Sequence, residues 1–179
     1  MATSAPASTL EIRRLDVVDT GQLQALADVL TDCVEGGASV SFMLPMTRAK
    51  ALAFWRHVAE GVARGERTLL VAEDGQGIVG TVQVILAQPE NQPHRADVAK
   101  MLVHRRARRQ GAGAALMRAA ESAALAEGKT LLVLDTADDT AARLYARLGW
   151  HAVGAIPRYA LLPAGGECAT TYFYRSLGD

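Results

Sequence analysis

The chain has 179 residues, of which 50% are hydrophobic and 21% are charged, with 19 acidic and 19 basic side chains. This length and composition can bury one sizeable core, so we expect one domain over residues 1–179, with residues 1–8 flexible. The balanced charge gives no net field that would concentrate a nucleic acid or an anionic membrane surface, and neither is expected as a partner. No window approaches the ~18 apolar residues of a membrane span, and no signal peptide pattern is found, so a cytoplasmic location is predicted.

The N-terminal third predicts one strand followed by two helices. Residues 10–17 alternate apolar and polar side chains, as an edge or second strand does. Apolar side chains recur at helical spacing over residues 22–35, and Gly36-Gly37 ends this helix. A second helix begins near Thr47 and ends by Gly65, so a loop over residues 36–45 lies between the two helices.

The middle of the chain predicts a hairpin and then a strand, helix, strand unit. Apolar runs on both sides of the turn Asp74-Gly75-Gln76-Gly77 are typical of a β-hairpin over residues 69–86. Residues 96–103 are strand-like, and residues 113–127 form an alanine-rich helix. Residues 131–134 are an uninterrupted apolar run, suited to a strand buried on both faces. A helix between two strands predicts that these strands pair in parallel.

The C-terminal third predicts a short helix and two strands. Residues 138–148 form the helix, and residues 150–162 and 169–177 are strands joined around residues 163–166. The last strand, rich in threonine and tyrosine, could pair or swap with a neighbouring subunit, so a homodimer is an open expectation. Helices and strands in this order place the chain in the α/β (α+β) class.

The sequence Arg108-Arg109-Gln110-Gly111-Ala112-Gly113 lies between the predicted strand at residues 96–103 and the helix that follows. The first backbone N–H groups of a helix have no partner within the helix, and the peptide dipoles make that end partially positive. Gly111 and Gly113 lack side chains that would keep a phosphate away, and the arginines of residues 105–109 add positive charge. The pattern predicts a pyrophosphate-binding turn; the alternative is a solvated basic turn that caps an ordinary helix.

Other nucleotide and metal motifs are not supported by their context. The sequence Gly75-Gln76-Gly77-Ile78-Val79-Gly80 spells the glycine motif of dinucleotide folds, but strand residues continue where that fold needs a helix. No Gly-Lys-Ser or Gly-Lys-Thr tripeptide of a nucleotide P-loop occurs. Cys33 and Cys168 match no metal or redox spacing, and the histidines form no ligand spacing, so no metal site is predicted.

Two segments resemble the GNAT superfamily of N-acetyltransferases. Met101-Leu102-Val103 followed by Arg108-x-x-Gly111-x-Gly113 is similar to the acyl-CoA-binding pattern Q/R-x-x-G-x-G/A. Residues 141–150, AARLYARLGW, are similar to the family segment A-x-x-L-Y-x-x-L-G-F. The resemblance implies acetyl-CoA as co-substrate and the GNAT fold: a mixed, mostly antiparallel central sheet with a splayed parallel strand pair and flanking helices.

The resemblance also implies a coenzyme site. The backbone N–H groups of residues 111–114 would bind the pyrophosphate, and the backbone of residues 101–103 would pair with the pantetheine arm as an added strand. Asp138 stands where the family often has asparagine, which leaves a side-chain contact from this position open. The implied coenzyme-binding residues are Met101, Leu102, Val103, Arg108, Arg109, Gln110, Gly111, Ala112, Gly113, Ala114, Asp138 and Tyr145.

Three side chains are candidates for catalysis. Tyr145 occupies the position of the family's tyrosine that donates a hydrogen bond or proton to the coenzyme A sulfur; its alternative role is an aromatic packed in the helix interior. Asp97 stands where several family members carry a catalytic carboxylate and is the first candidate for the base, although it could instead pair with Arg95 or Lys100. Asp135, at the C-terminal end of a buried strand, is the second candidate, with helix capping as its alternative.

Side chains of the strand that carries Asp97 can act together only where they lie on the same face of that strand. Strict alternation puts Asp97, Ala99, Met101 and Val103 on one face, unless a bulge intervenes. His104, at the end of this strand, is of a residue type suited to proton transfer, with simple exposure as its alternative.

The acceptor site is predicted from the first two helices and their loop. The side chains expected to contact the acceptor are Ser39, Ser41, Phe42 and Trp55. Ordinary turn hydrogen bonds would also explain the serines, and core packing is the favoured role of Phe54. Residues 36–43, 95–103 and 134–136 resemble segments of tabtoxin resistance acetyltransferases, which acetylate a toxic β-lactam amino acid.

We therefore expect acetyl transfer from acetyl-CoA to the amine of a small polar molecule, by direct transfer in a ternary complex. The absence of acidic or basic tracts favours a small acceptor over a macromolecule. Acetylation of a protein N-terminus or lysine, and a non-catalytic acyl-CoA sensor, are the alternatives that the sequence leaves open.

Overall fold

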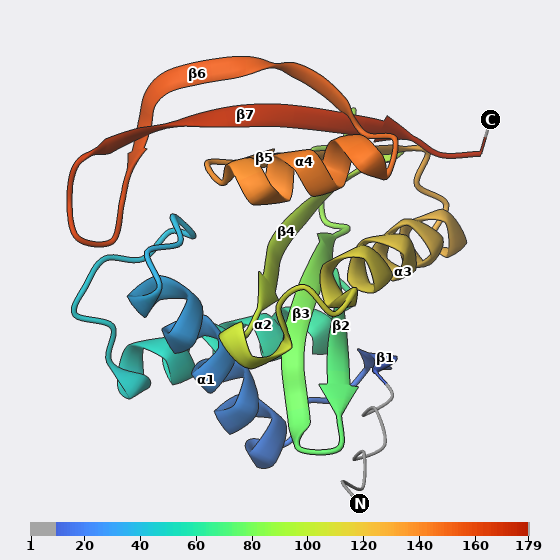
Figure 1. Ribbon diagram of the computed structural model, residues 1–179. Helices are drawn as coiled ribbons and strands as arrows, with labels where there is room; N and C mark the ends of the chain where they lie inside the picture. Colours follow the sequence, from blue (N-terminus) through green and yellow to red (C-terminus); the bar gives the residue numbers. More distant parts are fainter. Residues whose placement is uncertain (1–9, 179) are drawn as a thin grey trace, which may run out of the picture.

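Seven strands form one continuous sheet in the order β1-β2-β3-β4-β5-β7-β6 (Figure 1). The computed structural model describes residues 10–178, so the expected flexibility of residues 1–8 lies outside the described residues. The strands are β1 (Glu11–Leu15), β2 (Arg67–Asp74), β3 (Gly77–Ile85), β4 (Arg95–Val103), β5 (Leu131–Thr136), β6 (His151–Leu161) and β7 (Glu167–Ser176). The helices are α1 (Thr20–Glu35), α2 (Arg48–Ala63), α3 (Ala112–Ala126) and α4 (Asp139–Arg147), with a 3₁₀ turn, η1 (Arg105–Ala107).

The pairing of β4 with β5 is the parallel contact of this mostly antiparallel sheet. It confirms the predicted strand, helix, strand unit and the predicted fold class. The parallel ladder joins Arg95–Asp97 of β4 only to residues 131–133 of β5. The ladder ends at Asp97, where the two strands part, so the remaining edge of β4 carries no ladder to β5.

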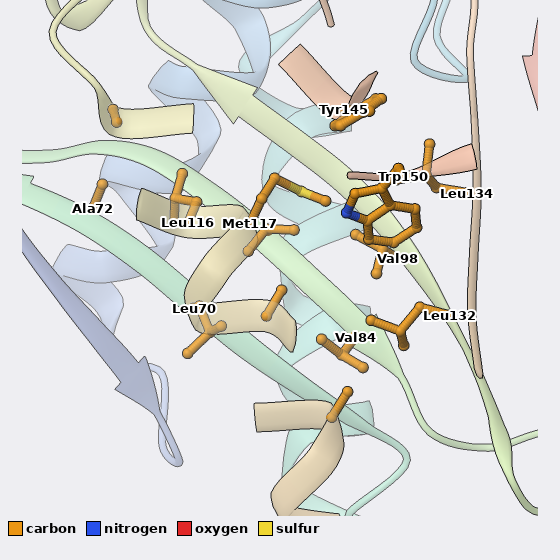
Figure 2. Packing of buried hydrophobic residues seen from close by; sticks show 14 of the residues in the cluster. Leu70, Ala72, Val84, Val98, Leu116, Met117, Leu132, Leu134, Tyr145 and Trp150 are labelled. Carbon is orange, nitrogen blue, oxygen red and sulfur yellow. The ribbon is translucent and has the colours of Figure 1, made fainter. Parts of the chain in front are cut away.

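Two hydrophobic clusters lie on opposite faces of the sheet. On one face α1 and α2 pack over β2, β3 and β4, with Trp55 and Leu69 fully buried between them. On the other face α3 packs over the strands, and Figure 2 shows its Met117 beside Val98 and Trp150. Asp19 caps α1 and Thr47 caps α2, each by accepting a hydrogen bond from a first-turn backbone N–H.

The expectation that β5 is buried on both faces is wrong. Leu132 and Leu134 are buried in the α3 cluster, but Leu131 and Val133 on the other face are only half-buried. The reason is that α1 and α2 do not extend over β5. Within residues 10–178, the cluster formed by α1 and α2 contains no β5 side chain. This face of β5 is therefore left open to a ligand or to solvent.

A β-bulge in β4 overturns the expected alternation. The register against β3 shifts between Thr81 and Gln83, and Lys100 adopts a left-handed φ of 52°. As a result Val98 and Met101 pack on the α3 face, whereas strict alternation separates them. The extra residue leaves Asp97 and Lys100 on the opposite face, the face that α1 and α2 partly cover.

The long β6–β7 hairpin reaches back to the loop between α1 and α2 (Figure 1). The backbone N–H of Leu44 donates to the carbonyl of Pro163 at 2.9 Å, and the Ser39 hydroxyl donates to the carbonyl of Leu161 at 3.3 Å. β7 pairs with β5 on one side and β6 on the other. The strand expected to pair with a neighbouring subunit thus has no free edge in the described chain, and β6 is the outer strand.

No helix within residues 10–178 is long and apolar enough to cross a membrane.

Candidate functional site

An open hollow of about 360 Å³ lies where β4 and β5 diverge. It is lined by Ile85, Asp97, Val98, Ala99, Val133, Leu134, Asp135 and Tyr172. Asp97 and Asp135, the two candidate bases, therefore lie in one hollow, although they are 38 positions apart in the sequence. They meet because the strands that carry them are neighbours and the ladder between these strands ends at Asp97.

Asp97 is held by two side chains. Its carboxylate makes an ion pair with Arg95 and accepts a hydrogen bond from Gln88 Nε2 at 3.1 Å, while 41% of its side chain stays exposed. Gln88 in turn accepts from Arg95 at 2.6 Å, which closes a small network at the base of β4. The predicted alternative of pairing with Arg95 is confirmed, and the role of Asp97 as a base stays a prediction.

Asp135 has a freer carboxylate. It accepts one hydrogen bond, from the Thr170 hydroxyl at 2.7 Å, and it makes no ion pair with any described residue. Its negative charge contributes to raising the pKa of Tyr145 and of Tyr172. Asp135 does not cap α4, because Asp138 does so by accepting from the backbone N–H of Thr140 and Ala141.

Tyr145 is buried at the edge of the α3 cluster, with 5% of its surface exposed (Figure 2). Its ring lies edge-on to Phe173 at a centroid distance of 5.7 Å. Burial is the main cause that raises the pKa of Tyr145, and the charges of Asp138 and Asp135 add to it. The phenol is therefore neutral at physiological pH, and its O–H has no hydrogen-bond partner among the residues that the structure describes, so it is free to act as a donor.

Tyr172 and Tyr159 were not predicted from the sequence as site residues. Their hydroxyls lie 2.9 Å apart, and this hydrogen bond is the main cause that raises the pKa of Tyr172 to about 12. Tyr172 pairs with Asp135 across the β5–β7 ladder. No local signal identifies Tyr172, because its place beside the hollow depends on a strand order that the sequence leaves open.

The turn before α3 has the geometry that an anion requires. Gly111, the N-terminal cap of α3, has a left-handed φ of 86° and gives the helix no side-chain cap. The backbone N–H groups that follow it are therefore free of a capping side chain, and a Cβ at residue 111 would have no neighbour within 4 Å. Such N–H groups with open space before them suit a phosphate group.

The arginine cluster next to this turn is less free than the sequence indicates. Arg105 pairs with Asp32 and Arg106 pairs with Asp74. Arg108 donates from Nε to the carbonyl of Val103 at 3.2 Å, whereas Arg109 makes no ion pair within residues 10–178. Gln110 also turns back, donating to the carbonyl of Arg106 at 3.0 Å.

Gly113 has a packing role that sequence analysis missed. A Cβ at this position would lie 3.0 Å from Leu144 Cδ2, so the absence of a side chain lets α4 approach the start of α3. Met101, a predicted coenzyme residue, lies beside the same contact, with its sulfur 3.7 Å from that Cβ position. Met101, Gly113 and Leu144 thus meet where β4, the start of α3 and α4 come together.

Trp55 does not contact an acceptor. It is fully buried, with 0% of its surface exposed, so the prediction that it lines the acceptor pocket is wrong. Phe54 takes the half-exposed position instead, with its ring 5.3 Å from that of Phe42 and beneath the Lys100 ammonium group. Ala51, Trp55 and Val58 are buried at helical spacing along α2. This spacing could have identified Trp55 as a core residue and Phe54 as the more exposed one.

The two predicted serines of the acceptor loop differ in their surroundings. Ser41 accepts a hydrogen bond from Lys100 Nζ at 3.1 Å and adopts a left-handed φ of 79°. Ser39 binds the β6–β7 hairpin instead, through the carbonyl of Leu161. Ser41 therefore contacts Lys100 of β4, whereas Ser39 holds the loop in place.

His104 contacts η1 and the Asp32 carboxylate. His104 Nδ1 accepts from the backbone N–H of Arg106 at 3.2 Å, and its Nε2 lies 3.6 Å from the Asp32 carboxylate, so it belongs to η1 and not to the hollow. Among residues 10–178, no group of three or more His, Cys, Asp or Glu side chains could hold a metal ion.

Comparison with known proteins gives consistent matches. Residues 65–152 match the family model of the acetyltransferase (GNAT) domain. An uncharacterized N-acetyltransferase from the hisH-hisA intergenic region of Azospirillum brasilense is 30% identical over 126 residues, which cover 69% of this chain and 73% of that protein.

Two solved structures share the fold at low sequence identity. An N-acetyltransferase from Staphylococcus aureus Mu50 superposes with a TM-score of 0.79 at 17% identity, covering 96% of this chain and 100% of that one. The structure of yncA from Salmonella typhimurium, which contains its cofactor acetyl-CoA, superposes with a TM-score of 0.76 at 18% identity, covering 95% of each chain.

Proposed function

Because the chain belongs to the GNAT superfamily of N-acetyltransferases, we propose that it transfers acetyl from acetyl-CoA directly to the amine of a small polar molecule, within a ternary complex. Acetyl-CoA-dependent acetyltransfer is the activity of the family; the acceptor and the order of events are the proposal. The coenzyme supplies an activated acetyl thioester.

The coenzyme would lie along the diverging edge of β4. The N–H groups of residues 111–114 would bind its pyrophosphate, and residues 101–103 would pair with its pantetheine arm. The uncapped start of α3 and the free edge of β4 beyond Asp97 support this placement. It directs the thioester toward the hollow that Asp97 and Asp135 line.

Transfer requires four coupled events. The neutral amine nitrogen attacks the thioester carbon and forms a C–N bond, the C–S bond breaks, the amine nitrogen loses a proton, and the departing thiolate gains one. Asp135 or Asp97 would take this proton, directly or through water. Tyr145, neutral and without a hydrogen-bond partner in the described chain, would donate a proton to the departing thiolate.

The observation that carries the proposal is the hollow itself. Its two carboxylates lie on the face of the sheet that α1 and α2 leave open, and its volume of about 360 Å³ lies at the small end of ligand sites. The α1–α2 loop is also held against the β6–β7 hairpin by two hydrogen bonds. A hollow of this small volume favours a small acceptor over an extended peptide.

The test is thiol release from acetyl-CoA, with amino acids, polyamines, aminoglycosides, β-lactam amino acids and peptides as acceptors. We expect turnover with one class of small amine, and a kcat at least about 10-fold lower in Tyr145→Phe at unchanged acetyl-CoA affinity. Tyr174→Phe is the matched control, because Tyr174 is exposed and stacks on His151, whereas Tyr145 is buried in the α3 cluster. Turnover of peptides alone, or tight binding of acetyl-CoA without turnover of any acceptor, would contradict the proposal.

A further inference from the structure

Lys100 carries a positive charge that no neighbouring carboxylate neutralises. Its half-buried side chain donates to the Ser41 hydroxyl at 3.1 Å, and its Nζ lies 5.8 Å from the centre of the Phe54 ring. Neither neighbour is an anion, and Lys100 makes no ion pair in the part of the chain that the structure describes. Burial accordingly lowers the pKa of Lys100, while the charge of Asp135 partly opposes this shift.

The other basic side chains of β4 and η1 are already paired. Arg95 binds Asp97, and Arg105 and Arg106 bind carboxylates on distant parts of the chain. A half-buried ammonium group without a counter-ion is costly unless a ligand supplies the negative charge. Lys100 is therefore the basic group that is placed to receive an anion from an occupant of the site.

The backbone directs this charge to the acceptor face of the sheet. The bulge at Lys100 puts its side chain on the same face as Asp97, instead of on the α3 face. The aromatic contact of Lys100 with Phe54 and its hydrogen bond to Ser41 fix the ammonium group beside the α1–α2 loop. A positive group at the loop and a negative group on β5, Asp135, thus lie on one face without forming an ion pair with each other.

We infer that Lys100 Nζ and the Ser41 hydroxyl bind a carboxylate of the acceptor, so that the acceptor is an amino acid or a close analogue whose amine is directed toward Asp135. This assignment rests on the proposed function and names its substrate class. Lys100 is a specificity-determining residue, because it binds a part of the acceptor that does not react. The carboxylate would complete the hydrogen bonding of Lys100 and Ser41.

The experiment compares α-amino acids with their carboxamides, which keep the side chain and the amine but lose the negative charge. Both sets are assayed with wild type, Lys100→Met and Lys100→Arg. For the best amino acid we expect kcat/KM to fall about 10- to 100-fold in Lys100→Met, mostly through KM, and to recover in part in Lys100→Arg. For the matched carboxamide we expect a change of less than about 3-fold, since a neutral group loses little when the ammonium group is removed.

Lys50→Met is the matched control for loop stability. Lys50 also holds the α1–α2 loop, by donating to the carbonyl of Met43 at 2.9 Å, but its side chain is exposed, whereas that of Lys100 is half-buried over the Phe54 ring. We expect Lys50→Met to keep the wild-type ratio of kcat/KM for the amino acid to kcat/KM for its carboxamide. An equal loss of this ratio in Lys50→Met would show that loop disorder is the cause, and would overturn the inference.

Direct titration of the same acceptors into the enzyme with coenzyme A gives a second readout that does not depend on turnover. Carboxylate-dependent binding that is lost in Lys100→Met supports the inference, whereas its absence in wild type overturns it. Turnover of amines with no preference for a carboxylate overturns the inference and leaves the proposed function intact. A lower affinity of Lys100→Met for acetyl-CoA itself would assign Lys100 to the coenzyme, and would also overturn it.

Discussion

Gly113 of α3 and Leu144 of α4 approach so closely that a Cβ at residue 113 would lie 3.0 Å from Leu144 Cδ2. This contact limits how closely α3, which begins at the turn proposed to bind the pyrophosphate, can approach α4, which carries Tyr145. We expect Gly113→Val to lower the free energy of unfolding by about 1–3 kcal/mol through overpacking, and to weaken acetyl-CoA binding. Urea denaturation and calorimetric titration of acetyl-CoA measure the two effects.

The double variant Gly113→Val/Leu144→Ala tests whether the contact with Leu144 causes the loss of stability in Gly113→Val. Removing the Leu144 side chain makes room for the new branch, so part of the lost stability should return. Additive losses in the double variant would mean that the contact with Leu144 does not limit the size of residue 113.

Gly111 supports a prediction about backbone strain. An alanine there would meet no neighbouring atom, but its left-handed φ of 86° disfavours any side chain by about 1–2 kcal/mol. We expect Gly111→Ala to lose about this much stability and to bind acetyl-CoA at least about 5-fold more weakly, because the N–H groups that follow would shift.

Gly128, at the other end of α3, provides the control. It has a left-handed φ of 75° and equally open surroundings, so Gly128→Ala should lose similar stability. Its acetyl-CoA affinity should equal that of the wild type. If both variants weakened acetyl-CoA binding to the same extent, general destabilisation and not the turn would be responsible.

The two carboxylates of the hollow are expected to differ in function. Asp97 is held by Arg95 and Gln88, whereas Asp135 is held by Thr170 alone. We expect Asp135→Asn to lower kcat about 100-fold at unchanged acetyl-CoA affinity, as the loss of a general base does. Asp97→Asn should lower the melting temperature and change kcat by less than about 10-fold. Steady-state kinetics of both variants test the assignment, and the reverse order would make Asp97 the base.

The raised pKa of Tyr145 predicts how stability depends on pH. The folded chain holds this phenolic proton more tightly than the unfolded chain, whose tyrosines lose it near pH ~10. The stabilisation is therefore complete below pH ~10 and is lost as the pH rises above that value, by up to about 1.4 kcal/mol per pH unit for each such group. Urea denaturation between pH 8 and about 11 should show this decline.

Tyr145→Phe should reduce the slope of this decline, because the variant has no phenol to ionise at that position. Tyr172, whose pKa is raised to about 12, contributes in the same direction and should account for part of the remaining slope. An unchanged slope in Tyr145→Phe would mean that Tyr145 ionises in the folded chain as readily as in the unfolded one.

Local patterns predicted much of this molecule. The hairpin turn at residues 74–77, the helix that Thr47 caps and the strand, helix, strand unit all follow from neighbouring residues, and all are confirmed. The left-handed Gly111 at the start of α3 is likewise a feature that a short glycine motif indicates. These elements depend on spacing and turn chemistry, which a sequence displays directly.

Features that depend on distant partners could not be predicted in the same way. The bulge at Lys100 exists only in the register against β3, and its consequence is that Lys100, not Met101, shares a face with Asp97. The pairing of Arg105 with Asp32 joins residues 73 positions apart. Tyr172 reaches the hollow because β7 lies next to β5, and nothing within either strand specifies that order.

The contact between the α1–α2 loop and the β6–β7 hairpin has a consequence for how this enzyme can diverge. Residues 36–45 and 161–166 lie outside the segment that matches the family model, yet Ser39 and Leu44 bind directly to Leu161 and Pro163. A change in one segment alters the surface on which the other rests, so new acceptors would arise through paired substitutions at the two ends of the chain. Homologues that share only the central region can then keep the same coenzyme chemistry and act on unrelated amines.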